Sequence, residues 1–497
     1  MTANTITCPV RKWSTVTPDS VLLRDSSNSV SFRNADKIVE RCMQRLAALG
    51  CQPGDRIAVL SGNSIDYAIT VFACLRCGIS IVPMNLRLSP QEWSDMILLA
   101  DCMAVVLTEE YKSFASEVDV PAASFDDLVS PPEEDSSDSP AGTEYEASIN
   151  TDQEAAVVFT SGSEGVPKGV RLTSGNLIHS AEASNENIKL DPGDCWLAVL
   201  PFYHVGGMSI QFRTALAGCS TYAMRSFDVR VVNDLIDFGG ISHISLVPTM
   251  LDSLLTNRGS KPLPGSLKAI LLGGSSVSPQ LRKTVIDKSL PVLFSYGLTE
   301  ASSQVCTNTP SDSGDKLLTS GKPLNHVRVR IVDRNGGDVD SGADGEIMIK
   351  GSGVFSGYLG DIGGDSFTDG GWFRTGDVGR IDAQGYLRVV GRIDDMFVSG
   401  GENVHSSSIE RVALSYSHVA ECAVIAVEDD KWGKRPILFV KPSSASLNIS
   451  DLVAHLEINL SRMMIPDMII ALDELPKKTI DKIDRERLLE IYRERQT

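Results

Sequence analysis

The chain has 497 residues and an ordinary globular composition, with 42% hydrophobic and 22% charged residues. This length exceeds what one hydrophobic core supports, so we expect roughly two to four structural units. The formal charge of −18 argues against a nucleic-acid partner, because neutralising phosphates requires a basic surface.

The first part of the chain alternates helix-like and strand-like segments. Apolar residues recur at helical spacing over residues 34–50, and Gly50 would end that helix. The same alternation continues over residues 56–60, 64–75, 79–85, 90–100 and 103–108. It predicts βα units and largely parallel sheets with helices on both faces. A stretch from Ser130 that is acidic and rich in Pro and Ser predicts a solvated connection.

Three later apolar runs, over residues 195–207, 244–251 and 267–278, end in loops containing Gly, Pro or His. Ligands of α/β sheets collect where strands end in such loops. From about Val327 the pattern changes to short alternating strands, and a small α/β unit follows Arg392. The predicted fold is α/β. It has a large N-terminal domain (1–391, with a β-rich subdomain at about 327–391) and a small C-terminal domain (392–497) that moves.

The loop in "VFTSGSEGVPKGVRLT", residues 158–173, combines glycines, hydroxyls and one lysine. Glycine permits close backbone approach, and successive N–H groups form an anion-binding concavity. The spacing matches neither the P-loop nor the dinucleotide fingerprint. A phosphate cradle and a mobile surface loop therefore both remain open at this point. The candidate phosphate-binding residues are Thr160, Ser161, Gly162, Ser163 and Lys168.

Four further motifs follow in order: "SYGLTE" (295–300), "GWFRTGD" (371–377), "GRIDD" (391–395) and "LPKKTIDKIDR" (475–485). Together with the loop, they resemble the adenylate-forming superfamily of acyl-CoA synthetases, luciferases and peptide-synthetase adenylation domains. The similarity runs over nearly the whole chain. It implies an enzyme that uses ATP and Mg²⁺ to activate a carboxylic acid as its acyl-adenylate.

The resemblance also implies roles for single residues. Glu300 would hold Mg²⁺, Tyr296 would stack on adenine, and Asp377 would accept the ribose hydroxyls. Lys482 would bridge the substrate carboxylate and the α-phosphate. Taken singly, Glu300 could cap a helix, Asp377 could close a turn and Lys482 could be a solvated lysine. Three more residues are assigned to the nucleotide and its chemistry: Thr299, Gly274 and Arg392.

In the second half-reaction, the resemblance implies coenzyme A as co-substrate. Asp394 matches the hinge of the mobile domain, and Gly401 matches the glycine lining a pantetheine tunnel. No carrier domain follows Lys482, which favours a free-standing CoA ligase. Two positions depart from the usual pattern: Glu164 stands where threonine is usual, and Asp481 stands where glycine is usual.

A closer similarity indicates which carboxylic acid would be the substrate. Residues 194–213, 270–278 and 295–307 resemble the o-succinylbenzoate–CoA ligases of menaquinone and phylloquinone synthesis. That substrate keeps a second carboxylate, and a buried anion needs a partner. Arg213 is the candidate partner, with His204 and Ser302 lining the same pocket. Arg213 could instead snorkel or pair structurally. An aryl- or medium-chain acyl-CoA ligase and a catalytically silent nucleotide-binding homologue also remain alternatives.

The N-terminus shows no apolar signal-peptide core, and no run of about 18 apolar residues predicts a transmembrane helix. The ten scattered cysteines predict reduced thiols and a cytoplasmic location. Cys74 and Cys77 form a lone C-x-x-C that favours a packed helix face over metal or redox chemistry. The expected partners are a small carboxylic acid, ATP and CoA; a homo-oligomer is compatible with the sequence.

Overall fold

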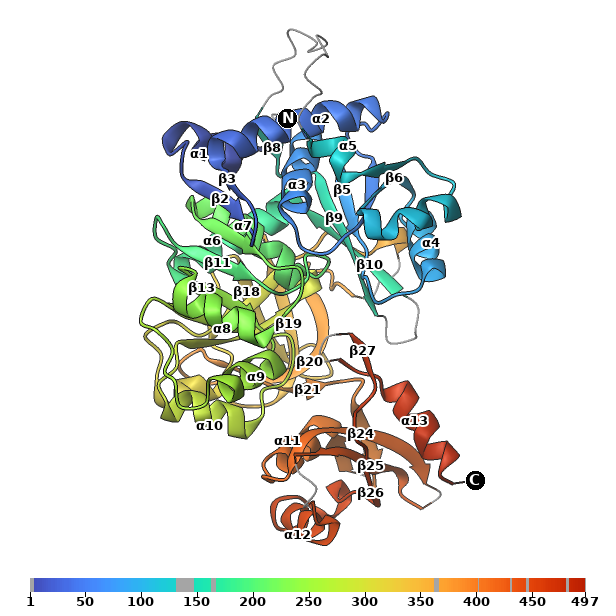
Figure 1. Cartoon of the computed structure of the whole chain (residues 1–497). Helices are drawn as coiled ribbons and strands as arrows, with labels where there is room; N and C mark the ends of the chain where they lie inside the picture. Colours follow the sequence, from blue (N-terminus) through green and yellow to red (C-terminus); the bar gives the residue numbers. More distant parts are fainter. Residues whose placement is uncertain are drawn as a thin grey trace, which may run out of the picture.

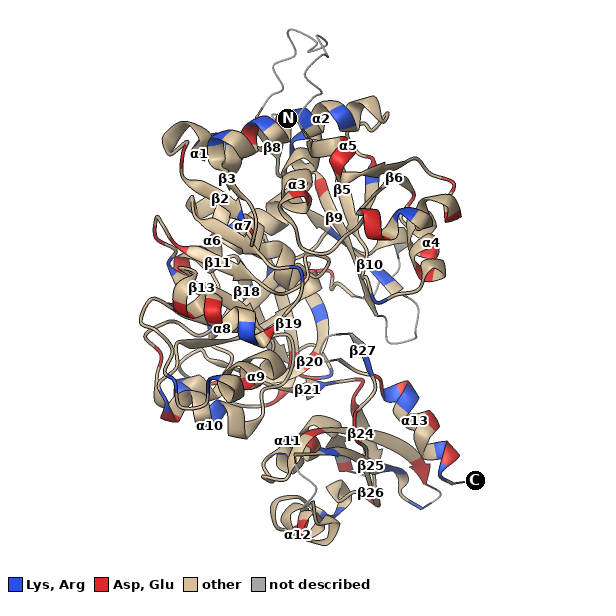
Figure 2. Cartoon of the chain, viewed as in Figure 1, with Lys and Arg blue, Asp and Glu red and all other residues tan. Residues whose placement is uncertain are grey.

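The computed structural model describes residues 4–130, 147–161, 167–361, 366–400, 402–429, 431–443, 447–479 and 482–496. The fold is α/β, with a large N-terminal domain above a small C-terminal one (Figure 1). Acidic and basic residues are interspersed on outer helices such as α10 and α13 (Figure 2). Within the described part of the chain, no helix has the length and apolarity needed to cross a membrane.

The first sheet of the N-terminal domain has six strands, and its inner pairs are parallel. In spatial order the strands are β10 (Pro167–Thr173), β9 (Glu154–Ser161), β5 (Ser80–Pro83), β4 (Arg56–Leu60), β6 (Cys102–Leu107) and β7 (Ala122–Ser124). The β9–β10 pair is antiparallel, so the loop between them is a hairpin connection. This hairpin is the predicted phosphate loop, and it lies at the edge of the sheet.

The second sheet has nine strands, and the strands from β11 to β15 run parallel. In spatial order the strands are β17 (Lys322–Pro323), β16 (Ser303–Thr307), β15 (Val292–Leu298), β14 (Ala269–Leu272), β13 (His243–Leu246), β11 (Cys195–Ala198), β12 (Ser220–Ala223), β2 (Val21–Arg24) and β3 (Ser29–Ser31). The predicted βα units and largely parallel sheets are therefore confirmed.

Helices connect these strands, and the apolar spacing of each places it against a core. They are α1 (Pro9–Val16), α2 (Phe32–Ala48), α3 (Ile65–Cys77), α4 (Pro90–Leu99), α5 (Phe125–Val129), α6 (Ser174–Ile188), α7 (Val205–Ala217), α8 (Val229–Phe238), α9 (Pro248–Arg258) and α10 (Pro279–Asp287). Ser64 caps α3, and Cys74 is buried in that helix, whereas Cys77 is partly buried. Gly50 follows the end of α2 with a φ of +90°, as its predicted helix-ending role requires.

The predicted β-rich subdomain is a four-stranded antiparallel sheet. Its strands are β18 (Val327–Val332), β19 (Gly345–Gly351), β20 (Phe373–Ile381) and β21 (Leu387–Arg392). Short 3₁₀ segments punctuate the large domain: η1 (Glu109–Glu117), η2 (Thr299–Ala301), η3 (Gly314–Leu318) and η4 (Leu359–Asp361). The predicted acidic connection after Ser130 lies outside the described residues.

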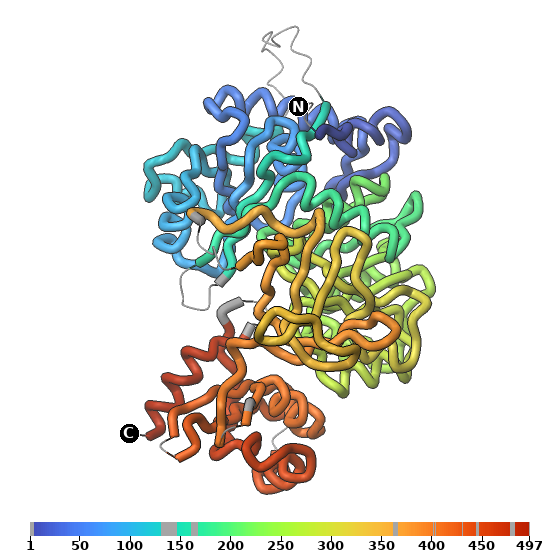
Figure 3. The backbone as a smooth tube through the Cα atoms, turned by 180° about the vertical axis from the view of Figure 1, so that it is seen from behind, coloured from blue at the N-terminus to red at the C-terminus, as the bar shows by residue number. Residues whose placement is uncertain are grey.

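The C-terminal unit lies at one end of the molecule, below the larger domain when seen from behind (Figure 3). It has its own sheet and its own buried apolar clusters. Its sheet contains β23 (Glu402–His405), β22 (Met396–Ser399), β25 (Gly433–Pro442), β24 (Val419–Asp429) and β26 (Met468–Ala471). It also carries α11 (Ser406–Leu414), α12 (Ile449–Asn459), η5 (Arg462–Met464) and α13 (Arg485–Glu494). Two small ribbons complete the described part: β1 (Thr5–Thr7) with β8 (Ser148–Asn150), and β27 (Lys477–Thr479) with β28 (Lys482–Ile483).

Helix α7 starts so close to the preceding loop that residue 207 has no room for a side chain. A Cβ on Gly207 would lie 2.2 Å from the carbonyl oxygen of Pro201. We expect Gly207→Ala to lower the free energy of unfolding by about 1–3 kcal/mol, because backbone must move. Urea denaturation measures this loss.

Gly206→Ala is the matched control, because its Cβ would meet Leu200 Cδ1 at an ordinary 3.6 Å. That variant should be neutral or gain up to about 1 kcal/mol from better helix propensity. Equal losses in the two variants would contradict the steric account.

Candidate active site

Glu300 lies just after a strand whose first three residues are buried. Strand β15 runs into η2, which contains Thr299 and Glu300. Tyr358 donates a hydrogen bond of 2.9 Å from its hydroxyl to Glu300 Oε1. The ammonium of Lys168, from β10, lies 5.5 Å from the Tyr358 ring centre. Tyr358 therefore contacts the candidate magnesium ligand through its hydroxyl, and the phosphate-loop lysine lies over its ring.

The environment of Glu300 suits a cation. Burial raises the pKa of the Glu300 carboxyl, and the Tyr358 hydrogen bond offsets part of that effect. A carboxylate held in such surroundings gains stability when a positive charge approaches it. Oxygen ligands of this type are those that Mg²⁺ prefers. The described residues form no cluster of three or more candidate ligands, so water and phosphate oxygens would complete a site here.

A second group joins β15 to the β-rich subdomain. Tyr296 donates a 2.6 Å hydrogen bond to Asp377 Oδ2, and Arg392 contacts Asp377 Oδ1 at 3.1 Å. Burial raises the pKa of Asp377, while the charge of Arg392 and the Tyr296 hydrogen bond counteract it. Burial alone would lower the pKa of Arg392, but the charges of Asp377 and Asp394 raise it. The predicted adenine, ribose and hinge residues therefore form one hydrogen-bonded and ion-paired group.

Two other predicted nucleotide residues, Thr160 and Gly274, lie near or just after the C-terminal ends of their strands, β9 and β14. Thr160 donates a long, 3.4 Å hydrogen bond to the carbonyl of Lys168 across the β9–β10 pair. Gly274 follows β14 with a φ of +88°, a backbone conformation that favours glycine. Gly162, Ser163, Glu164, Gly401 and Asp481 lie outside the described residues, as do the side chains of Ser161 and Lys482.

Ser302 and Ser303 form a strained turn directly after η2. Their φ angles are +57° and +124°, and consecutive non-glycine residues with such values cost of order 1–3 kcal/mol each. Ser302 Oγ donates to the carbonyl of Gly353 at 2.9 Å, which helps to hold the turn. Backbone strain of this kind concentrates at functional sites. The prediction that Ser302 belongs to the site is consistent with this geometry.

Arg213 is fully enclosed on α7, with 1% of its surface exposed. Its Nη2 donates a 3.1 Å hydrogen bond to Ser303 Oγ, and its guanidinium lies 5.2 Å from the Trp196 ring centre. Its Nε and Nη1 have no hydrogen-bond partner anywhere in the described ranges. Burial lowers the pKa of Arg213 to about 9. The snorkelling alternative is therefore wrong, because the guanidinium does not reach solvent.

His204 sits at the N-cap position of α7, next to the ring of Tyr203, with ring centres 4.7 Å apart. Sequence reasoning missed three neighbours of the site: Tyr358, Ser303 and Trp196. Tyr358 and Trp196 lie in short motif-like segments, "SGYLG" and "DCWLAVLP", so their positions offered a signal. The partner role of Ser303 depends on its unusual backbone angle, which composition does not reveal.

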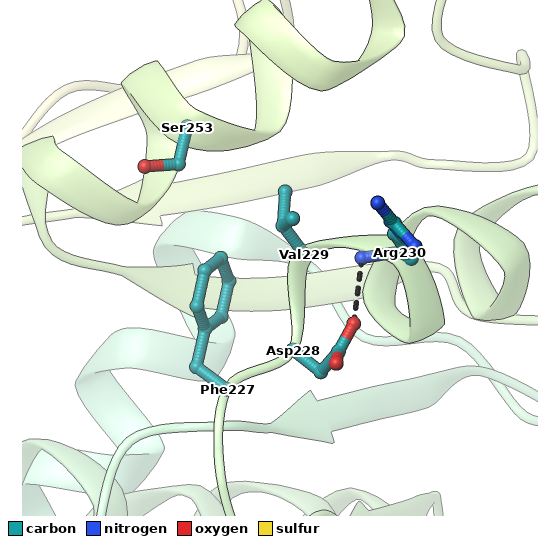
Figure 4. A pocket seen from close by; sticks show the side chains of 5 residues that line it. All are labelled: Phe227, Asp228, Val229, Arg230 and Ser253. Atoms are coloured by element: carbon teal, nitrogen blue, oxygen red, sulfur yellow. Dashed lines mark hydrogen bonds between the residues drawn. The ribbon is translucent and has the colours of Figure 1, made fainter.

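A shallow hollow elsewhere on the surface is separate from this site. It lies beside the start of α8 and is lined by Phe227, Asp228, Val229, Arg230 and Ser253 (Figure 4). Asp228 Oδ1 accepts hydrogen bonds from the backbone N–H groups of Arg230 and Val231. Asp228 is therefore the N-cap of α8, and this structural role explains its position in the hollow.

Two family profiles match the chain: AMP-binding enzyme over residues 10–359, and AMP-binding enzyme C-terminal domain over residues 408–482. The chain therefore belongs to the AMP-binding enzyme family. It is 32% identical to 2-succinylbenzoate–CoA ligase of Bacillus cereus (strain ATCC 10987 / NRS 248) over 96% of this chain and 97% of that protein. A second B. cereus ligase of that name, from strain AH820, is 34% identical with the same coverage.

Solved structures show similarity to the same kind of ligase. O-succinylbenzoate CoA synthetase (MenE) from Bacillus subtilis, in complex with the acyl-adenylate intermediate OSB-AMP, superposes with a TM-score of 0.90. It is 32% identical to this chain, and the match covers 98% of each chain. The same enzyme in complex with ATP and magnesium ion superposes with a TM-score of 0.88 at 31% identity, covering 98% of this chain and 100% of that one.

We expect Tyr358→Phe to raise the KM for ATP about three- to tenfold at fixed Mg²⁺, because it removes one hydrogen bond worth roughly 1 kcal/mol. Glu300 would lose its fixed orientation, while the ring facing Lys168 would remain. Steady-state kinetics with varied ATP measure the effect.

Tyr386→Phe is the control, because its hydroxyl donates a similar 2.7 Å hydrogen bond to Asp312, which belongs to neither group of site residues. It should leave the ATP KM unchanged. An equal rise in both variants would show that Tyr358 acts through general stability.

Proposed function

We propose that this protein is an ATP-dependent acid–CoA ligase that converts o-succinylbenzoate into o-succinylbenzoyl-CoA through an acyl-adenylate. The observation that carries the proposal is the buried Arg213, which lacks a carboxylate partner in the described part of the chain. It is bonded to the turn that follows Glu300. A receptor for a substrate anion thus adjoins residues suited to a nucleotide and its metal ion.

The reaction needs two steps because a carboxylate is a poor electrophile. One carboxylate oxygen of the acid attacks the α-phosphorus of ATP, and pyrophosphate leaves. The thiol of CoA then attacks the acyl carbon, loses its proton, and AMP leaves with the electron pair of the broken C–O bond. The reaction is one step of menaquinone or phylloquinone biosynthesis.

In the first step, the protein brings two anions together and stabilises their charge. Lys168 and the β9–β10 loop would hold the terminal phosphates, and Glu300 would hold Mg²⁺, which neutralises phosphate charge when bound. Tyr296 would lie against adenine. Asp377, kept in place by Tyr296 and Arg392, would accept the ribose hydroxyls.

In the second step, we propose that the C-terminal domain turns about Asp394, which lies 3.5 Å from Arg392 in an ion pair. Gly401 would then leave room for the pantetheine arm. All ten cysteines are free thiols, which supports a reducing, cytoplasmic location.

A CoA-dependent AMP-release assay with a panel of carboxylic acids tests the proposal. We expect o-succinylbenzoate to be the best substrate. Efficient turnover of aryl or medium-chain monocarboxylates, with none of the diacid, would replace the substrate assignment and keep the ligase class. No acid-dependent AMP release would favour a silent homologue.

Lys482→Ala should impair adenylate formation far more than thioester formation from supplied acyl-adenylate. The reason is that a bridging cation matters most where two anions meet. Pyrophosphate exchange measures the first half-reaction and single-turnover thioester formation measures the second. Equal losses in both would count against the role proposed for Lys482.

Arg213→Ala should reduce kcat/KM for o-succinylbenzoate by at least roughly tenfold, which corresponds to about 1.4 kcal/mol. Activity on benzoate or hexanoate should fall much less, since these acids lack the second charge. Steady-state kinetics on both kinds of acid give the comparison.

Arg258→Ala is a matched control, because Arg258 is also buried but forms a 2.8 Å ion pair with Asp237. Its loss should affect stability without changing the preference among acids. An equal loss on charged and uncharged acids in Arg213→Ala would mean that Arg213 supports the fold only.

A further inference from the structure

Two histidines accompany Arg213 in the interior. His326 precedes β18, is 7% exposed, and neither of its ring nitrogens has a hydrogen-bond partner within the described ranges. His179 lies on α6, half-buried, and its Nδ1 is likewise buried without a partner among residues whose positions are described. Unpartnered buried nitrogens on several basic side chains are costly, and natural structures rarely keep them without a reason.

Contacts link His326 to the same turn that Arg213 touches. A Cβ on Gly353 would lie 2.1 Å from Cδ2 of His326, so this ring packs directly on Gly353. The carbonyl of Gly353 accepts the hydrogen bond from Ser302, and Ser303 accepts the one from Arg213. The guanidinium therefore contacts the Ser302–Ser303 turn directly, and the imidazole packs on Gly353, which is hydrogen-bonded to that turn.

The electrostatics agree with this proximity. Burial is the main cause that lowers the pKa of His326 to about 4; the backbone of Gln304 acts in the opposite direction, and the charges of His179 and Arg213 act in the same direction as burial. No acidic side chain contributes to the lowered pKa of Arg213, which has burial as its cause. The ring of His326 is therefore neutral at pH 7, and no carboxylate among the described residues receives its N–H.

Helix α6 meets the same turn, because Ser180, the residue next to His179, donates a 3.3 Å hydrogen bond to the carbonyl of Ser302. The elements that carry these three basic side chains therefore all adjoin the Ser302–Ser303 turn. We propose that His326 and His179 are specificity-determining residues that, together with Arg213, receive the second carboxylate of a dicarboxylic substrate. The inference rests on the proposed function and deepens it. A carboxylate has two oxygens and about four acceptor positions, so it has room for donors besides one guanidinium.

The test compares two acids of the same skeleton. One is o-succinylbenzoate and the other is 4-oxo-4-phenylbutanoate, which lacks the ring carboxylate. The readout is the ratio of kcat/KM for the diacid to kcat/KM for the monoacid. A loss of stability lowers both kcat/KM values together. Loss of a protein group that donates a hydrogen bond to the ring carboxylate lowers the ratio.

We expect His326→Ala to lower this ratio roughly fivefold or more, as befits a hydrogen bond to a charged group. His326→Gln keeps a side-chain donor and should retain most of the ratio. His179→Ala should lower the ratio about two- to threefold, and because this residue is only half-buried it also serves if His326→Ala fails to fold. The loss should appear mainly in the KM for the diacid.

Asn233→Ala is the control for removing a buried polar side chain elsewhere. Asn233 is buried on α8, where its amide donates to Asn257 Oδ1 and accepts from Arg258, and neither partner belongs to the Ser302–Ser303 turn. Its ratio should match that of the wild type. An unchanged ratio in the His326 and His179 variants of an enzyme active on the diacid would overturn this inference alone. Absence of diacid turnover by the wild type would overturn the proposed function as well.

Discussion

A buried guanidinium, with no carboxylate partner among the described residues, is the constraint on which the proposed acyl site depends. Burying an unpaired charge costs several kcal/mol, and a fold tolerates it only where other interactions offset that free energy. Arg213 donates one hydrogen bond to Ser303 Oγ and lies over the ring of Trp196. Two of its nitrogens are left without acceptors in the described part of the chain. Under the proposed function, a ligand carboxylate would supply the missing acceptors, so the same feature would account for the choice of a diacid substrate.

The candidate residues for the acyl group and for the nucleotide are joined by the short segment that follows β15. Strand β15 ends in η2, and the Ser302–Ser303 turn follows at once, so Glu300 and the partner of Arg213 are only three residues apart. Tyr358 and Asp377 come from distant parts of the chain and fix Glu300 and Tyr296 by hydrogen bonds. If the proposed roles hold, this short segment would position the two anions that must react, which is the main requirement of phosphoryl transfer.

Much of the fold was predictable from periodicity, whereas the candidate nucleotide residues were predicted from ordered motifs. The alternation through residues 56–108 gave the parallel strands because buried strands and amphipathic helices differ in period. Tyr358, His326 and Ser303 were not predicted. Their roles depend on backbone conformation and on contacts between segments far apart in sequence, such as Gly353 against His326. Arg213 was predicted to be a substrate residue, but its burial and its missing partners became visible only in three dimensions.

A crystal structure of the protein with o-succinylbenzoate and ATP bound would test the central claim most directly. The account predicts an oxygen of the substrate's second carboxylate about 2.7–3.2 Å from Arg213 Nη1 or Nε. A second carboxylate that points to solvent, or an Asp or Glu side chain of the protein paired with Arg213, would contradict it.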